Sequence, residues 1–497
     1  MKYKKSFLLL FLAINMVGCQ GARDEAVNES AEVVTLSHTI WTDKTELFVE
    51  FKPLVVGQNT RFAAHFSEME QFKAITEGKV TVSLIKNKTG IRQTVDAPDS
   101  PGIFKPSITP KTTGIYTLVF EITTPTLTDR IQIENVVVYA NTNEVLKNVH
   151  PEKEDPNAIT FLKEQAWKME FANAPVVRGT VYDIIKTGGK ILPSQGDEKT
   201  IIATTSGIVI YASTRSMVGT EVSKGQTLFT ITGGNLTNNN VETRFIQSKS
   251  NYTREKSNFE RKGQLFESKA ISKSEYEEAQ RMYQLAESEY NNLASNFGGK
   301  GKIIKASSAG FIKTLFKGEG EYVEAGEALA VITQNKRLTI QADVSQLDYH
   351  RINESSSANF SFNGKAYSLA DFNGKLLSYG KSVSVENPKI PVYFELDNTG
   401  NLLSGSFIDV WIKTNPSSAT LKIPVLAVME EYGAFSAYVQ VSGESFEKRE
   451  LELGVSDGIY VEVISGVKEG ERVVTFGAYQ VKMASMSGQV PAHGHSH

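Results

Sequence analysis

The chain has 497 residues, which is enough for several domains, and its 22% charged and 40% hydrophobic residues are ordinary for folded soluble protein. Its formal net charge of -3 is spread without a basic patch, which argues against nucleic-acid binding. A single cysteine, Cys19, excludes an internal disulfide and a thiolate metal cluster.

The N-terminal residues resemble an export signal that ends in a lipid-attachment site. Three lysines precede an apolar run, residues 7–14, that is too short to span a bilayer. The run leads into MVGC, which resembles a bacterial lipobox and so implies that the Cys19 thiol is acylated. We therefore expect a signal peptide at 1–18 and a lipidated linker at 19–34, which would hold the chain at a membrane, in the periplasm. An ordinary cleaved signal with an incidental cysteine is the alternative.

Short runs of alternating apolar and polar residues fill 35–142, among them TELFVEF, KVTVSLI and GIYTLVFEI. Gly, Pro, Asn and Asp mark the turns between these runs. The pattern predicts an all-β, immunoglobulin-like sandwich. His65 and Met69 stand four residues apart within it, in surroundings that favour a packing role.

Two segments in the middle of the chain repeat each other. VGTEVSKGQTLFTIT at 218–232 aligns with EGEYVEAGEALAVIT at 319–333. Each copy predicts a strand, a glycine turn and a second strand. The copies resemble the half-motifs of a biotinyl/lipoyl domain, which is a small sandwich of two interlocked halves. The lysine hairpin that carries the cofactor in that family is absent between them, so an enzyme with a swinging cofactor is the remotest alternative.

The segment between the two copies has the spacing of a coiled coil. Apolar residues recur in steps of three and four along its second half and every seven residues along its first half. We expect two helices of about 28 residues each, roughly 40 Å long, with a turn near 268–271 and an N-cap at Ser272. The seam residues are Val241, Phe245, Tyr252, Phe259 and Phe266 on the first helix, and Tyr276, Ala279, Tyr283, Ala286, Tyr290, Leu293 and Phe297 on the second.

Split lipoyl halves with a long helical insertion are similar to the membrane fusion, or periplasmic adaptor, family (HlyD-like). The resemblance covers about 159–482 as an ordered set of motifs. RLTIQADVSQLDYHRI at 337–352 predicts a strand and a short helix, and the stretch 392–412 resembles the closing motif of the adaptor β-barrel. The strands of 423–482 resemble the family's membrane-proximal domain.

The expected fold class is mainly β, modular and elongated, with an inserted α-helical hairpin. The expected domains are the sandwich at 35–142, a membrane-proximal domain at 150–200 and 418–486, a lipoyl-like domain at 201–235 and 302–333, the α-helical hairpin at 236–301, a β-barrel domain at 334–417 and a histidine-containing tail at 487–497.

The hairpin turn carries a second resemblance. Adaptors that dock on outer-membrane channels tend to have an Arg, a Leu four residues later and a Ser seven residues beyond, and Arg261, Leu265 and Ser272 fit this spacing. The resemblance implies that these three residues dock a channel. The alternative is that Arg261 is a solvated helix residue, Leu265 covers the end of the coiled coil and Ser272 is only a cap.

The family resemblance implies four partners: an inner-membrane transporter of the resistance-nodulation-division (RND) type, an outer-membrane channel of the TolC type, further copies of the chain in a hexameric ring, and a lipid membrane. The sandwich and FLKEQAWKMEF at 161–171 resemble the heavy-metal branch, so the expected function is an adaptor for efflux, with heavy-metal cations as the expected cargo. The alternatives are an adaptor of an ATP-driven drug or protein exporter and a ligand-binding surface lipoprotein.

The sequence carries no catalytic motif: it has no P-loop, no G-x-S-x-G and no H-E-x-x-H, so we expect neither an enzyme nor a cofactor. The tail ends in HGHSH, in which His493, His495 and His497 alternate and can bind Zn²⁺ or Cu²⁺ as a transported or sensed ion. The alternative is a tail with incidental histidines.

Overall fold

The computed structural model describes residues 34–87, 89–150, 157–213, 217–234, 240–298, 301–383, 388–400 and 402–486. The chain divides into two compact units. One comprises the chain up to Phe171 together with Val441–Phe446 and Val481–His497, and the other comprises Ala172–Gln440 and Glu447–Gln480. Within the described ranges, no helix combines the length and the apolar character needed to cross a membrane.

The first unit is built on a sandwich of two sheets, and the mainly-β fold class is confirmed. Phenylalanine rings from both sheets meet between them, such as Phe62 and Phe120 with ring centroids 5.6 Å apart. The first sheet contains β1 (Leu36–Trp41), β2 (Thr45–Phe51), β4 (Thr60–Glu68) and β5 (Lys73–Ala74), with β8 (Ile103–Phe104) and β9 (Ser107–Ile108) on β4. The second contains β3 (Leu54–Val55), β11 (Thr128–Tyr139), β10 (Gly114–Thr123), β6 (Lys79–Lys86) and β7 (Thr89–Val95), and α1 (Thr142–Asn148) follows.

Part of the segment expected in the membrane-proximal domain belongs to this first unit. The range 150–200 was assigned there on family resemblance, but β12 (Ile159–Thr160) and α2 (Lys163–Ala166) group with the sandwich. The reason is burial, because the Trp167 indole donates a hydrogen bond to Ser67 of β4 at 2.8 Å. Residues at the other end of the range, in β15 (Glu198–Ile202), pair with a strand of the lipoyl-like domain.

The two repeats form the lipoyl-like domain and exchange strands. Its sheets are β15, β23 (Ala328–Thr333), β21 (Gly310–Leu315) and β17 (Glu221–Val222), and β19 (Phe297–Gly298), β20 (Gly301–Lys305), β18 (Thr227–Thr232), β16 (Gly207–Tyr211) and β22 (Tyr322–Val323). The first repeat's β17 pairs with β21 of the second, and the second repeat's β22 pairs with β16 of the first. Gly207 and Gly310 are equivalent, and a Cβ on either would meet a backbone oxygen within 2.6 Å, which explains glycine at both places.

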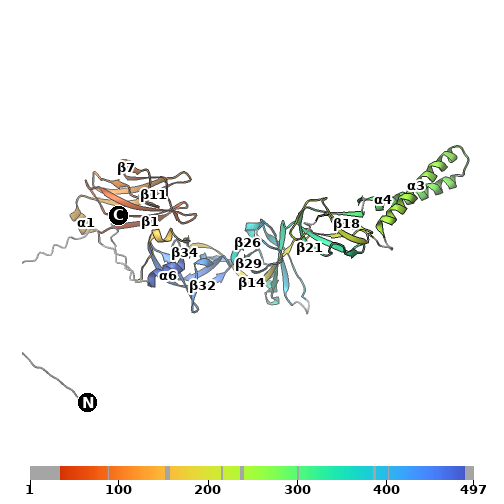
Figure 1. Ribbon diagram of the computed structural model, residues 1–497. Coiled ribbons are helices and arrows are strands. Elements are labelled where there is room, and N and C mark those ends of the chain that lie inside the picture. The colour runs from red at the N-terminus through yellow and green to blue at the C-terminus, as the bar shows by residue number, and fades with distance from the viewer. Residues whose placement is uncertain are drawn as a thin grey trace, which may run out of the picture. The chain divides into compact units, whose positions relative to one another are not determined.

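A single sheet continues from the barrel strands into the membrane-proximal strands. Two long strands, β14 (Val177–Pro193) and β29 (Phe407–Pro424), take part in both regions (Figure 1). The barrel region adds β24 (Arg337–Val344), η1 (Gln346–Asp348), α5 (Tyr349–Ile352), β25 (Ser357–Phe362), β26 (Lys365–Ser368), η2 (Leu369–Phe372), β27 (Lys375–Tyr379) and β28 (Ile390–Asp397). The membrane-proximal region adds β13 (Ala172–Pro175), η3 (Val425–Ala427), β30 (Met429–Glu431), β31 (Ala434–Gln440), β32 (Ser445–Ser456), β33 (Tyr460–Ser465), β34 (Arg472–Phe476) and α6 (Ala478–Met486).

Candidate docking site

Helices α3 (Val241–Glu267) and α4 (Lys273–Ala294) lie side by side as an antiparallel hairpin (Figure 1). The helix expected to reach Phe297 ends at Ala294, because Asn296 takes a left-handed backbone with φ 55° and the chain enters β19. The Phe297 ring still joins the seam, since it stacks on Phe245 with centroids 4.1 Å apart.

The seam between the helices is a ladder of aromatic rings that come alternately from α3 and α4. Phe259 lies between two tyrosines of α4, with ring centroids 5.4 Å from Tyr276 and 5.4 Å from Tyr283. Such stacked pairs contribute about 0.5–1.5 kcal/mol each beyond the area they bury. In order from the lipoyl-like end the rings are Phe297, Phe245, Tyr290, Tyr252, Tyr283, Phe259, Tyr276 and Phe266.

Small residues separate the rungs and let the helices approach closely. Ala279 and Ala286 are each only 3% exposed, and Ser248 of α3 is buried with its hydroxyl on the Phe245 carbonyl at 2.9 Å. The Tyr283 hydroxyl donates to Glu287, and this hydrogen bond, with a further one to Tyr252, raises the pKa of the Tyr283 phenol. The seam is therefore apolar in its rings and hydrogen-bonded at its edges, which fixes one register.

The turn at the tip is closed by backbone hydrogen bonds and by a capping box. Lys269 adopts a left-handed backbone with φ 63°, and the Ala270 amide donates to the Leu265 carbonyl at 2.7 Å. The Ser272 hydroxyl accepts from the Glu275 amide at 3.3 Å and donates to the Glu275 carboxylate at 2.9 Å. The Ser272 backbone amide also donates to that carboxylate, and these two bonds from Ser272 hold the pKa of Glu275 below its usual range.

The three residues expected to dock a channel occupy different environments. Arg261 and Leu265 lie one turn apart on the same face of α3. Arg261 is exposed and donates to Asn258 at 3.0 Å, and the Leu265 side chain is 40% exposed. Ser272 begins the other helix and uses its hydroxyl within the capping box. Arg261 and Leu265 can thus contact a partner directly, whereas Ser272 shapes the turn.

Two further exposed apolar residues on the hairpin were missed by the sequence analysis. Met282 and Leu285 of α4 are 41% and 58% exposed, three residues apart on one face. They stand beside the seam positions Tyr283 and Ala286 rather than on them. A comparison of each apolar residue with the heptad would have identified both, because an apolar residue off the seam faces solvent.

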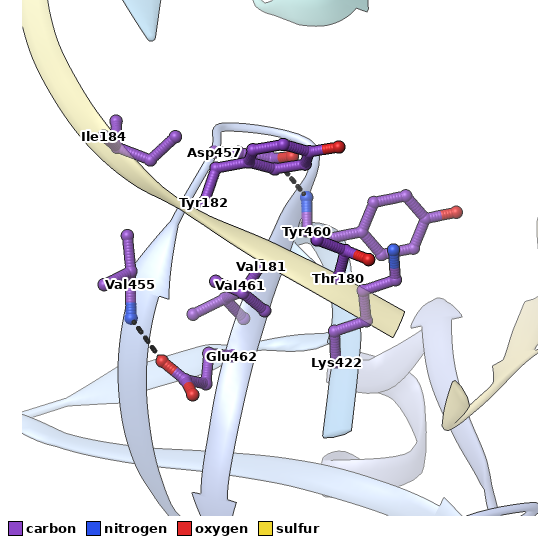
Figure 2. A pocket seen from close by; sticks show the side chains of 10 residues that line it. All are labelled: Thr180, Val181, Tyr182, Ile184, Lys422, Val455, Asp457, Tyr460, Val461 and Glu462. Carbon is purple, nitrogen blue, oxygen red and sulfur yellow. Dashed lines mark hydrogen bonds between the residues drawn. The ribbon is translucent and has the colours of Figure 1, made fainter. Parts of the chain in front are cut away.

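A shallow hollow lies on the membrane-proximal region where β14 meets β29 and β33, and Figure 2 shows the side chains that line it. Its carboxylates hold the backbone: Asp457 accepts from the Tyr460 amide at 2.7 Å, and Glu462 accepts from the Val455 amide at 3.3 Å. The Lys422 ammonium lies 4.9 Å from the centre of the Tyr460 ring. These groups are engaged in structural contacts, and the hollow presents no arrangement of nucleophile and base.

The remaining candidate sites concern the two ends of the chain. Cys19 and the tail histidines His493, His495 and His497 lie outside the described residues. Across the parts of the chain that the structure describes, no group of three or more His, Cys, Asp or Glu side chains is placed to hold a metal ion.

Comparison with known proteins gives matches in sequence and in fold. Residues 421–482 match the family described as the CzcB C-terminal circularly permuted SH3-like domain. The solvent efflux pump periplasmic linker SrpA of Pseudomonas putida is 26% identical over 287 residues, which are 54% of this chain and 72% of SrpA. The toluene efflux pump periplasmic linker protein TtgG, from another strain of Pseudomonas putida, is also 26% identical over 287 residues, 54% of this chain and 71% of TtgG.

Among solved structures, ZneB from Cupriavidus metallidurans is 22% identical, with a TM-score of 0.32 over 65% of this chain and 97% of ZneB. A MacA–MexA chimeric protein that contains the Pseudomonas aeruginosa MexA α-hairpin domain is 20% identical, with a TM-score of 0.41 over 60% of this chain and 98% of the chimera. TM-scores this low support no functional conclusion.

Proposed function

Since the chain belongs to the same family as the periplasmic linkers of efflux pumps, that is, the periplasmic adaptor or membrane fusion proteins, we propose that it joins an inner-membrane, proton-driven RND-type transporter to an outer-membrane channel of the TolC type. The observation that carries the proposal is the hairpin, which presents Arg261 and Leu265 at its turn. A rigid two-helix arm with an exposed apolar residue at its end is suited to meeting another protein. The transporter supplies the energy, and this chain supplies the connection.

The Leu265 side chain supplies apolar contact at the channel, and the Arg261 guanidinium reaches carbonyl or carboxylate oxygens there. Covering the part of Leu265 that is now exposed contributes about 1 kcal/mol per copy, which a ring of copies multiplies. Leu265→Asp should therefore abolish export and crosslinking to the channel, while thermal melting of the purified chain stays unchanged. Resistance and crosslinking are measured in the same strain.

The matched control is Leu285→Asp, which makes the same change at an exposed leucine of α4 away from the turn. This variant should keep resistance and crosslinking. Full resistance with undiminished crosslinking in Leu265→Asp would rule out the tip as the docking surface. Equal loss in both variants would show that general damage to the hairpin explains the result.

Self-association into a ring, which we propose as a hexamer, is supported by the charges of the two helices. Helix α3 carries six Lys or Arg and four Glu, whereas α4 carries two Lys or Arg and five Glu. Unlike helices of neighbouring copies therefore attract each other, and like helices repel. A head-to-tail contact of this kind closes into a ring. Native mass spectrometry at low salt measures the copy number, and a strictly monomeric chain at all concentrations would exclude the ring.

The cargo that we propose is a heavy-metal cation, and the support is the match of residues 421–482 to the CzcB C-terminal domain. The relatives SrpA and TtgG are linkers of solvent and toluene pumps, so organic solvents are the competing cargo class. Deletion of the chain should lower tolerance of Zn²⁺ or Cu²⁺ more than tolerance of toluene. The reverse order would assign the pump to solvents.

We propose acylation of Cys19 as the membrane anchor and the histidine tail as a Zn²⁺ or Cu²⁺ ligand, both on sequence grounds. Cys19→Ala should release the mature chain into the soluble periplasmic fraction, and palmitate labelling that persists in this variant would exclude the anchor. Removal of residues 493–497 should weaken metal binding in calorimetric titrations of the purified chain. Identical titrations of the full-length and shortened chains would exclude the tail as a ligand site.

A further inference from the structure

The outer face of the sandwich's first sheet is unusually polar for a buried surface. Register places Glu46 opposite Ser67 and Phe48 opposite His65, with all four side chains on the face that points away from the core residues Leu47 and Phe66. Glu46 is 1% exposed and His65 is 4% exposed. A face that is always buried would be expected to carry apolar residues, so this composition is typical of a surface that can also meet water.

Two segments from distant parts of the chain cover this face, and we call them together the strap: residues 159–171 and Val441–Phe446. They pair with each other, since Ile159 lies opposite Phe446 in a short two-stranded ladder. The strap fits the sheet closely. The Gly443 amide donates to the Thr39 hydroxyl at 2.7 Å, and a Cβ on Gly443 would lie 2.2 Å from the Phe48 ring.

Carboxylates outnumber cations between the strap and the sheet. Lys163 of the strap lies 2.6 Å from Glu46, and this pair is almost fully buried. Glu164 lies 3.6 Å from the His65 imidazole. Glu444 accepts a hydrogen bond from the Lys163 amide at 2.8 Å, with Glu50 of β2 close enough to act on its charge.

Four carboxyl groups thus face one lysine and one histidine. The Nδ1 atom of His65 is buried and has no hydrogen-bond partner among the described residues. The imidazole also lies against two aromatic rings, 5.4 Å from Phe48 and 6.2 Å from Trp167. The imidazole is therefore the titratable base within this excess of negative charge.

Either of two protons would strengthen the contact. A proton on the His65 imidazole turns a neutral ring into a cation beside Glu164 and Glu444, and imidazole ordinarily changes charge between pH 5 and 8. A proton on Glu444 removes its repulsion with Glu164 and Glu50. Burial raises the pKa of the Glu444 carboxyl, so the covered state holds this proton to a higher pH than the uncovered state does.

We propose that the strap is a proton-controlled clamp on the sandwich, which closes more tightly as the pH falls and loosens as the pH rises. The groups that set this behaviour are His65 on β4, Glu46 and Glu50 on β2, Lys163 and Glu164 on α2, and Glu444 in the 441–446 turn. The sign follows from linkage. For a carboxyl whose pKa is raised by covering, the covered state gains as the pH falls through that raised pKa and is weakest above it.

The size of the effect has an upper limit. For each proton taken up on closing, the closing equilibrium changes by at most about tenfold per pH unit. Two coupled groups would make the transition steeper than one. We therefore expect the fraction of open strap to rise by about ten- to a hundredfold between about pH 5.5 and about pH 8.

Hydrogen–deuterium exchange on the full chain tests the clamp. Exchange of peptides from 159–171 is followed at about pH 5.5 and about pH 8, each rate being corrected for intrinsic chemical exchange and divided by that of β28 peptides. In the unmodified chain, corrected exchange of the strap should rise with pH. In Glu444→Gln, which is fixed in the uncharged form, exchange at the higher pH should slow toward the low-pH value.

His65→Gln removes the second proton site and should flatten the remaining dependence. The matched control is His350→Gln, because His350 is exposed on α5 in the other unit, and this variant should behave as the unmodified chain. Trp167 emission gives an independent signal. A protonated imidazole at 6.2 Å quenches indole, so a pH-dependent change should be present in the control and absent in His65→Gln. Strap exchange that is independent of pH, or whose pH dependence survives in Glu444→Gln and His65→Gln alike, would overturn the clamp.

Discussion

The hairpin seam and the strap-covered face of the sandwich both bury aromatic rings between two elements, yet they are built in opposite ways. The seam repeats one residue type every seven positions on two helices that are neighbours in the chain. The strap contact joins residues 100, 281 and 404 positions apart, through Ser67 and Trp167, Lys163 and Glu444, and Thr39 and Gly443. The seam tolerates loss of one rung because its neighbours are alike, whereas each strap contact is unique.

The largest expected effect is at the buried ion pair. Lys163→Met removes the ammonium that neutralises Glu46, and the sandwich should lose about 3–5 kcal/mol of unfolding free energy. Denaturant unfolding followed by Trp fluorescence measures it. The double variant Lys163→Met with Glu46→Leu should recover most of the loss, because an apolar pair avoids the buried charge. A single variant as stable as the unmodified chain would show that the pair contributes nothing.

A smaller effect is expected at a single rung of the ladder. Phe259→Ala removes two stacked contacts and should lower the local stability of the hairpin by roughly 2–3 kcal/mol. Exchange protection of the α3 and α4 amides is the measurement, and Phe259→Leu should lose about half as much. If the alanine variant unfolds the barrel amides as well, the rungs are not independent and the contrast with the strap is weakened.

The smallest effect is expected at the tip. Ser272→Ala should cost about 1 kcal/mol of helix capping and return the pKa of Glu275 upward to its ordinary range. Because the folded pKa of Glu275 is lowered, its contribution is present above the ordinary carboxyl range and is lost as the pH falls through the lowered value. A carboxyl NMR titration of Glu275 measures the shift, with Ser274→Ala as control. An unchanged Glu275 pKa in Ser272→Ala would contradict the capping assignment.

The same contrast explains what the sequence could predict. The helices fall on either side of the turn predicted at 268–271, and Ser272 caps α4, because heptads and capping boxes are local signals. The mainly-β class also followed from local alternation. The strap did not, since no local pattern states that Lys163 meets Glu46 or that Gly443 meets Phe48. His65 was expected to pack, and it does lie against Phe48, but its Glu164 neighbour could not be anticipated.

The exchanged strands of the lipoyl-like domain and the distant origin of the strap have a consequence for the order of folding. The hairpin joins neighbouring segments, so it can form as soon as both helices have emerged, whereas closure of larger loops is slower. The sandwich strands come first in the chain, but Gly443 reaches Thr39 only after 404 more residues are available. During synthesis or export from the N-terminus, the polar outer face of β2 and β4 therefore waits uncovered longest. Its hydrophilic side chains keep this waiting surface from attracting other chains before Val441–Phe446 arrives.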